Sequence, residues 1–243
     1  MISFLRQAHR IYSLVIILVF SALFSPFFYL ASRRPGGYRI LNWLRKADSF
    51  IISALTGVFY VFDFEQALEK DRTYIYCANH SSNYDIMAMC ILGRGRFHFM
   101  GKEELLDNPV LKIFFRTIDI PVNRESRMSS FRAFKRAADN LDKGMSLIIF
   151  PEGKIDDTYP PKLGEFKNGP FRLAIEKNVA IVPVSLTNIW KVIWDDGVRY
   201  GTRPGICNIY VHKPVSTSDL NINDADSLKD RIFDLINSKL VYK

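Results

Sequence analysis

At 243 residues, of which 48% are apolar, the chain can build one sizeable hydrophobic core, or one core and a membrane segment. The formal net charge of +8 favours anionic partners such as phosphates, acidic lipids or an acidic protein. Three cysteines without metal-type spacing argue against a zinc site and fit a reduced domain that faces the cytosol.

The N-terminus carries an uncharged apolar segment. The 22 residues from Ile11 to Ser32 include no charged side chain, and arginines flank them on both sides. Such a run is long enough to span a bilayer, and it is long for a cleaved signal peptide. Pro26 would also permit a kinked helix that enters the membrane from one side. We expect membrane association and leave open whether the segment spans.

A second helix is expected after the break at Pro35-Gly36-Gly37. Between residues 38 and 56, apolar side chains recur on one side and polar side chains occupy the other, which predicts an amphipathic helix. The apolar stripe either packs on the globular core or lies in the membrane interface. Residues 1–56 are therefore predicted to be membrane-anchoring helices and residues 57–243 a separate domain. The apolar positions are Ile40, Leu44, Ala47, Ile51 and Leu55, and the polar positions include Arg39, Asn42, Arg45, Lys46 and Ser49.

From Gly57 onward, strand-like and helix-like segments alternate. Strand patterns cover residues 58–64, 73–78, 96–100, 146–150, 180–186 and 206–212. Helical patterns cover residues 84–92, 110–116, 128–141, 169–177 and 225–240. This alternation predicts an α/β domain with a mostly parallel sheet flanked by helices, and functional loops at the strand ends.

The stretch CANHSSNYD follows the second predicted strand and brings a histidine and an aspartate close together. In a continuous helix His80 and Asp85 would point apart. They can meet if His80 ends a loop and Asn83 caps a helix that begins at Tyr84, with Asp85 near its positive end. Such a pair is weak evidence for catalysis when taken alone. Neither Ser81 nor Ser82 lies in a nucleophile elbow, because no G-x-S-x-G occurs.

Other predicted strand ends carry cations and turn residues. Lys102 and Arg124 are suited to phosphate recognition, although solvated surface charge is the ordinary interpretation. Glu152 and Gly153 follow an apolar strand, where an internal salt bridge and a tight turn are the ordinary interpretations. No metal is expected, because the four histidines are scattered and no H-E-x-x-H occurs.

Four motifs occur in one order along the chain. They are N-H-x4-D from Asn79, G-K-x-E-L from Gly101 with a later arginine, F-P-E-G from Phe150, and V-P-V from Val182. This ordered set resembles the glycerolipid acyltransferase family, in particular 1-acylglycerol-3-phosphate acyltransferases of the bacterial membrane type. The resemblance covers about residues 74–186, and the hydrophobic N-terminal helix pair is also similar to that family.

The resemblance implies that residues 57–243 form an acyltransferase catalytic domain. It would move a fatty acyl chain from an acyl carrier protein or coenzyme A thioester to the 2-hydroxyl of 1-acylglycerol 3-phosphate, giving phosphatidic acid. His80 would be the general base and Asp85 would orient it. Backbone amides near His80 or Asn83 would stabilise the oxyanion. No cofactor is implied beyond the thioester co-substrate. The acceptor phosphate would be held by the loops that carry Lys102, Arg124, Glu152, Gly153 and Lys154.

The chain departs from the family after F-P-E-G, where the family commonly has Thr-Arg. Here Lys154 is followed by Ile155, Asp156 and Asp157, so a cation is kept but the forked guanidinium is lost. If Lys154 binds phosphate, the two aspartates should lie outside the pocket. Two alternatives stay open: acylation of another lysolipid, and a catalytically silent membrane lipid-binding protein.

The segment 128–141 is a basic helix that sets Phe131 and Phe134 on one side and Arg132 and Lys135 on another. A solvated face is the ordinary interpretation, and docking of an acidic acyl carrier protein or of anionic lipid is the alternative. Nucleic acid is not an expected partner, because no recognised module is present. The expected partners are a lysophospholipid acceptor, the thioester donor and membrane lipid. The expected location is the cell inner membrane, with the catalytic domain facing the cytoplasm.

Overall fold

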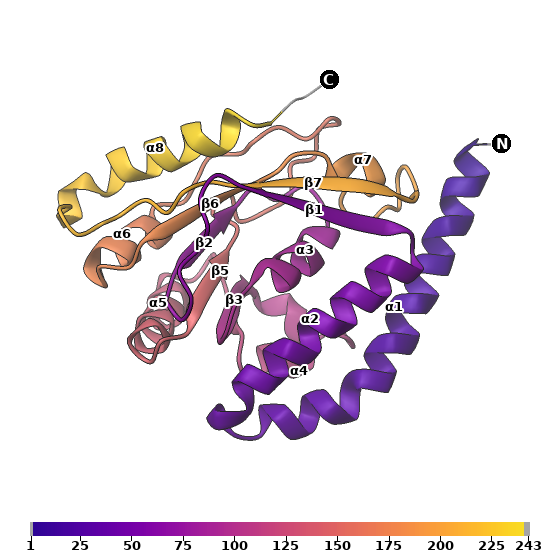
Figure 1. Ribbon diagram of the computed structural model, residues 1–243, viewed down its shortest axis with the longest axis horizontal. Helices are drawn as coiled ribbons and strands as arrows, with labels where there is room; N and C mark the ends of the chain where they lie inside the picture. Colours follow the sequence, from indigo (N-terminus) through magenta and orange to yellow (C-terminus); the bar gives the residue numbers. More distant parts are fainter. Residues whose placement is uncertain (1, 241–243) are drawn as a thin grey trace.

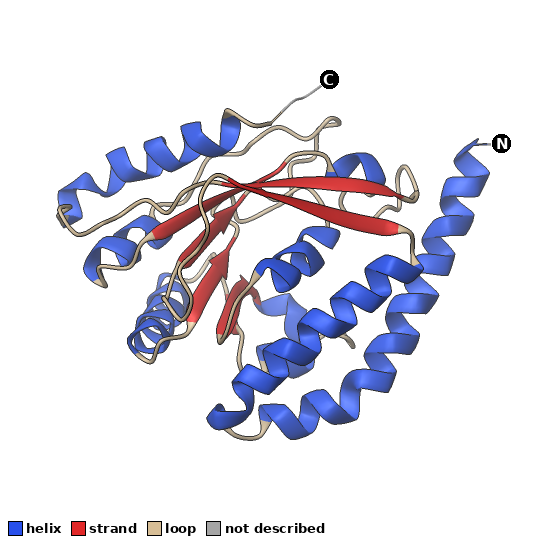
Figure 2. Cartoon of the chain, viewed as in Figure 1, coloured by secondary structure: helices blue, strands red, loops and turns tan. Residues whose placement is uncertain are grey.

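The computed structural model describes residues 2–240, which form one seven-stranded sheet with helices on both faces (Figures 1 and 2). The strand order is β1-β7-β6-β2-β5-β3-β4, and every neighbouring pair is parallel except β6 with β7. The predicted α/β class with a mostly parallel sheet is confirmed. The strands are β1 Val58–Phe64, β2 Ile75–Ala78, β3 Phe97–Lys102, β4 Ile120–Val122, β5 Ser146–Ile149, β6 Ile181–Leu186 and β7 Gly205–Val211.

The predicted elements agree with the structure within three residues at their ends. Five short elements were not predicted: β4, α7 and the three 3-10 helices η1, η2 and η3. β4 has only three residues, and Pro121 occupies its centre. The helices are α1 Ile2–Ser32, α2 Tyr38–Leu55, α3 Tyr84–Leu92, α4 Lys112–Phe115, α5 Arg127–Asp142, α6 Gly169–Glu176, α7 Ile189–Val192 and α8 Ala225–Asn237, and the 3-10 helices are η1 Pro35–Gly37, η2 Glu103–Leu106 and η3 Ile222–Asp224.

The two faces of the sheet bury separate cores. In β2, the side chains of Tyr76 and Ala78 join a core with α3, whereas Ile75 and Cys77 join a core with α5, α6 and α8. This division follows from the alternation of side chains along a strand. The helices α1 and α2 lie on the α3 side, and α5, α6 and α8 cover the opposite face (Figure 1).

Within residues 2–240, α1 is the one helix long and apolar enough to cross a membrane. Only 6% of its most apolar 18-residue window is buried. The helix does not project away from the domain. Arg10 donates to the carbonyl of Asp196 at 3.3 Å near one end, and Phe28 packs on Phe114 near the other. The choice between spanning and monotopic anchoring stays a prediction.

The amphipathic helix α2 packs with its polar side toward the domain. Asn42 and Arg45 are buried, while Trp43 and Phe50 are 65% and 62% exposed. The sequence interpretation in which the apolar stripe packs on the core is wrong for Ile40 and Leu55, which are 59% and 45% exposed, whereas Leu44 packs partly against a core that includes Leu41. Periodicity finds the two sides of a helix but not which of them is buried.

A buried ion pair explains the inversion of α2. The guanidinium of Arg45 donates to both carboxylate oxygens of Asp119, at 2.9 and 3.1 Å, and both side chains are almost fully buried. The same guanidinium lies over the rings of Phe99 and Phe114. Removing one partner of such a pair typically costs about 3–5 kcal/mol. The helix pair of residues 1–56 is thus fixed to the α/β part, and its description as a separate anchoring domain stays a prediction.

Candidate active site

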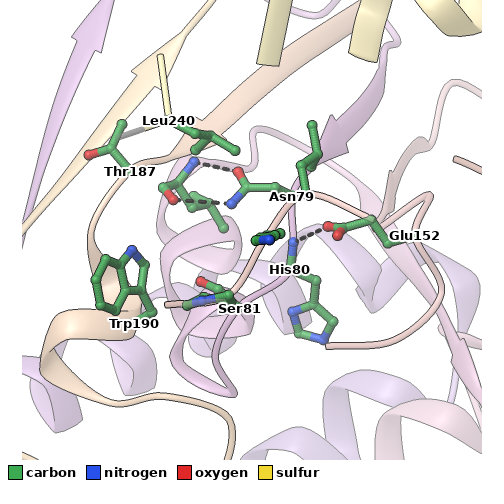
Figure 3. A pocket seen from close by; sticks show the side chains of 11 residues that line it. Asn79, His80, Ser81, Glu152, Thr187, Trp190 and Leu240 are labelled. Carbon is green, nitrogen blue, oxygen red and sulfur yellow. Dashed lines mark hydrogen bonds between the residues drawn. The ribbon is translucent and has the colours of Figure 1, made fainter. Parts of the chain in front are cut away.

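The loop after β2 is pinned to the end of β6. The side-chain amide of Asn79 donates to the carbonyl of Leu186 at 3.1 Å and accepts from its N–H at 2.7 Å (Figure 3). Asn79 directly follows β2, and Leu186 is the last residue of β6. Because β2 and β6 are parallel, this contact lies at the carboxyl edge of the sheet. The asparagine of the N-H-x4-D motif therefore fixes the position at which His80 leaves the sheet.

His80 and Asp85 meet as the loop-and-helix geometry predicts. Nδ1 of His80 lies 3.0 Å from Oδ2 of Asp85, which is fully buried in the first turn of α3. The same oxygen accepts the N–H groups of Ser81 and Ser82 at 2.6 and 2.8 Å, so it serves as an acceptor toward all of these neighbours. The proton of the neutral imidazole then belongs on Nδ1, and Nε2 is the basic nitrogen. The ring stacks on Phe150 with 4.1 Å between centroids.

The start of α3 differs from the prediction in one contact. Asn83 occupies the N-cap position, but its side chain makes no capping bond. Instead, the hydroxyl of Ser82 accepts the N–H of Tyr84 at 3.0 Å. The predicted start of the helix at Tyr84 is therefore confirmed. The predicted capping residue is wrong, because the neighbouring Ser82 makes the capping hydrogen bond in place of Asn83.

The backbone amides of this loop are already used within the protein. His80 donates to Glu152, Asn83 donates to the carbonyl of Asp195 at 3.0 Å, and Asp85 donates to the carbonyl of Ser82 at 3.1 Å. The amides of residues 81, 82 and 84 are used in the contacts described above. The expectation that amides near His80 or Asn83 stabilise an oxyanion is therefore wrong for this arrangement.

Glu152 bridges two segments of backbone. Oε1 accepts the N–H of His80 at 2.6 Å (Figure 3). Oε2 accepts the N–H of Gly164, also at 2.6 Å. The side chain is 6% exposed, and burial raises the pKa of Glu152 to about 8, against the opposing effect of the two N–H donors. Glu152 does not line the cavity that holds the other expected site residues; it lines a separate small pocket with His80 (Figure 3).

His80 lines a cavity of about 400 Å³ that has a charged part and an apolar part. The expected phosphate residues Lys102, Arg124, Gly153 and Lys154 all line this cavity. Lys102 ends β3, Arg124 follows β4 and Gly153 follows β5, so three neighbouring parallel strands deliver them to one edge. The apolar part is lined by Ile86, Phe99, Met100, Leu105, Leu111, Phe115, Phe150 and Ile155.

The two aspartates after Lys154 lie in different surroundings. Asp156 shapes the loop, since its Oδ2 accepts the hydroxyl of Thr158 and the N–H of Lys162. Asp157 lines the cavity and lies 3.9 Å from the ammonium of Lys154. The expectation that both aspartates stay outside the pocket is thus met by Asp156 and wrong for Asp157.

Asp195 was not predicted to belong to the site. Its backbone pairs with the catalytic loop, donating to the carbonyl of Ser81 at 3.1 Å and accepting from Asn83, and its side chain lines the cavity. The residue has a left-handed backbone with φ of 51°. The turn-forming residues Asp195-Asp196-Gly197 gave a sequence signal for a loop, but no local pattern shows that this loop returns to His80.

The fold and the site together define an α/β enzyme with a His–Asp pair beside a cavity lined by both charged and apolar side chains. Residues 61–187, more than half of the chain, match the family model described as Acyltransferase. The chain belongs to this acyltransferase family.

Several relatives are named 1-acyl-sn-glycerol-3-phosphate acyltransferase. The chloroplastic protein of Arabidopsis thaliana is 30% identical over 67% of this chain and 46% of its own length. The protein of Haemophilus influenzae is 27% identical over 68% of each chain. This chain spans 46% to 61% of the length of the plant and algal relatives.

A solved structure shares the fold over nearly the whole length. The crystal structure of the 1-acyl-sn-glycerophosphate (LPA) acyltransferase PlsC from Thermotoga maritima superposes with a TM-score of 0.81 at 21% identity. The match covers 98% of this chain and 95% of that one. The likeness therefore includes the N-terminal helix pair as well as the α/β part.

Proposed function

We propose that this chain transfers a fatty acyl group from an acyl carrier protein or coenzyme A thioester to the 2-hydroxyl of 1-acylglycerol 3-phosphate. The product is phosphatidic acid, a precursor of phospholipids. The observation that carries the proposal is that His80, paired with Asp85 at 3.0 Å, lines a cavity that Arg45, Lys102, Arg124 and Lys154 also line. The names of the relatives point to the same reaction.

In the proposed reaction, Nε2 of His80 removes the proton of the acceptor hydroxyl while its oxygen attacks the thioester carbonyl. Asp85 holds the ring through Nδ1 and stabilises the imidazolium. When the C–S bond breaks, the imidazolium returns the proton to the leaving thiolate. The two substrates supply all reacting groups, so no metal, further cofactor or serine nucleophile is required.

Positive charge in this site comes from side chains. Lys102, Arg124 and Lys154 line the cavity beside His80, so we assign them to the acceptor phosphate and to the developing oxyanion. Glu152 is assigned a positioning role through the His80 backbone, because its two oxygens accept the N–H groups of His80 and Gly164 and its side chain does not line the cavity. Gly153, at φ of 79°, permits the turn that brings Lys154 to the cavity.

We propose that the outer side of α1 and α2 lies in the lipid surface. Large apolar side chains are exposed on both helices, including Leu18, Phe27, Trp43 and Phe50. The acceptor is a membrane lipid and the thioester donors are cytoplasmic, so the proposed location is the cell inner membrane with the catalytic domain facing the cytoplasm.

Acylation of a zwitterionic lysolipid is the second candidate. Asp157 and Asp195 line the cavity among the cations, and a carboxylate there suits an ammonium group better than a doubly charged phosphate. A silent lipid-binding protein is less favoured, because the His80–Asp85 pair has the geometry that catalysis requires.

The test is an acylation assay with the full-length protein in detergent. Lysophosphatidic acid and a zwitterionic lysolipid are compared as acceptors, each with carrier-protein and coenzyme A thioesters. Preference for lysophosphatidic acid supports the first proposal. Preference for the zwitterionic acceptor replaces it with the second, and binding of lysolipid without turnover favours the silent protein.

A further inference from the structure

The outward side of α5 combines exposed apolar and cationic side chains. Met128 and Phe131 are 62% and 66% exposed, and Arg127, Arg132 and Lys135 surround them. Residues 127–136 contain four cations and no acidic residue. We call Arg127, Met128, Phe131, Arg132 and Lys135 the α5 surface. Phe131 and Phe134 were predicted on the same side of this helix, but Phe131 is exposed whereas Phe134 packs against the core.

Packing against the sheet does not require these side chains. The buried residues of α5 are Ala133, Ala137 and Leu141, which join the core with α6 and α8. An exposed phenylalanine and methionine among arginines have the composition of a protein interface, in which aromatic residues, Met and Arg are enriched. The solvated-face interpretation accounts for the cations but not for the two exposed apolar side chains.

The α5 surface begins beside the mouth of the cavity. The strand β4 ends at Val122, Arg124 lines the cavity, and α5 starts at Arg127 after the cap by Ser126. The first turns of α5 therefore lie at the carboxyl edge of the sheet, where His80 also lies. A partner seated on this surface is close enough to pass a flexible arm into the cavity.

Lipid is a poor occupant for this surface. The exposed apolar sides of α1 and α2 lie on the α3 side of the sheet, and α5 covers the opposite face (Figure 1). A membrane that receives α1 and α2 is thus turned away from α5. The α5 surface is also the convex outside of a helix, whereas small-ligand sites such as those for nucleotides are concave.

We propose that the α5 surface docks a small acidic carrier protein that presents the acyl thioester on a flexible arm. The inference rests on the proposed function, since it names the donor for that reaction. The cations complement an acidic helix of the carrier and orient it, and Met128 and Phe131 supply the apolar centre of the contact.

The test measures kinetics of the full-length protein in detergent with two donors that carry the same acyl chain, one on acyl carrier protein and one on coenzyme A. Arg132→Glu should raise KM for the carrier thioester roughly tenfold and leave kcat and the coenzyme A kinetics unchanged. Phe131→Ser should act in the same direction without a change of charge. Added salt should raise the carrier KM of the unmodified protein.

Arg231→Glu is the matched control. Arg231 is exposed on α8, which covers the same face of the sheet, so it undergoes the same charge reversal away from the α5 surface. Both donors should keep their kinetics in this variant. Unchanged coenzyme A turnover in all variants shows that the fold is intact.

Three results overturn the inference while the proposed function stands. These are an unchanged carrier KM in Arg132→Glu, an equal rise of KM with both donors, and turnover by the unmodified protein with coenzyme A thioester but not with carrier. Loss of binding to anionic vesicles in Arg132→Glu, with an unchanged carrier KM, assigns the surface to lipid instead. No acylation with either donor refutes the proposed function and the inference with it.

Discussion

The variant Glu152→Gln separates two roles for this residue, binding of the acceptor and positioning of His80. Each oxygen of Glu152 accepts one backbone N–H at 2.6 Å, from His80 and from Gly164. Glutamine offers one acceptor oxygen, so its NH2 group must face the second donor. A bond to a charged acceptor is worth about 1.5–3 kcal/mol, or roughly tenfold to a hundredfold in kcat if the base shifts with its backbone.

The pH dependence gives a signature that simple loss of structure lacks. Burial raises the pKa of Glu152 to about 8, and only the ionised form has both oxygens free of a proton. The groups that face it are His80, Asp85 and Asp156, and the charges of the two aspartates also raise its pKa. Between about pH 7 and pH 9, kcat should rise in the unmodified protein, and Glu152→Gln should lack this rise.

As pH rises, the stability of the fold should change in the opposite direction to kcat. A carboxyl group whose pKa is raised in the folded state stabilises the fold fully below its unfolded pKa and loses this contribution as pH rises through about 8. The free energy of unfolding should therefore fall between about pH 5 and pH 9, and this fall should be smaller in Glu152→Gln. Denaturant titrations at both pH values measure it.

The assay is steady-state kinetics with acceptor and donor varied separately. Glu152→Gln should lower kcat at about pH 9 and leave the acceptor KM nearly unchanged. Gly164→Ala provides a second perturbation, since a Cβ there would lie 3.1 Å from Oε2 of Glu152, and it should give the same pattern. Gly36→Ala is the control, with no heavy atom within 4 Å of the added carbon. A raised acceptor KM at constant kcat would refute the positioning role.

Three further predictions concern other parts of the molecule. Arg45→Ala should lower the free energy of unfolding by about 3–5 kcal/mol, because it leaves Asp119 buried without its partner. Arg39→Ala breaks an exposed ion pair and should lower the free energy of unfolding by less than about 1 kcal/mol. Equal effects of the two variants in denaturant titrations would contradict this. Lys102→Ala or Arg124→Ala should raise the KM for lysophosphatidic acid roughly tenfold or more and spare the donor KM, and the reverse pattern would exclude the phosphate assignment. Ser82→Ala should cost about 0.5–2 kcal/mol of stability through the lost cap of α3, and a thermal-unfolding midpoint equal to that of the unmodified protein would show that the cap contributes nothing.

The sequence was sufficient where the decisive contacts are local. Tyr84–Leu92 was predicted with the bounds that the structure has, because a strand, a capping residue and an apolar run follow one another directly. The meeting of His80 and Asp85 depends on that same local geometry. The cations Lys102 and Arg124 could be assigned to one edge because parallel strands end there.

The sequence was insufficient where a contact joins distant segments. Nothing near Glu152 shows that its carboxylate is used by His80 and Gly164, and nothing near Asp195 shows that its backbone pairs with the catalytic loop. The orientation of α2 depends on Asp119, a residue 74 positions from Arg45. These contacts join residues that are far apart in the sequence, and the periodicity of apolar residues within one segment does not predict them.

The most direct test of the account compares acylation of lysophosphatidic acid by the unmodified protein and by His80→Ala, in detergent and with equal thermal-unfolding midpoints. The account predicts formation of phosphatidic acid by the unmodified protein. His80→Ala should reduce kcat by roughly 10²–10⁴-fold, the contribution typical of a general base. Turnover of folded His80→Ala at the rate of the unmodified protein would contradict the central claim that His80 removes the proton of the acceptor hydroxyl.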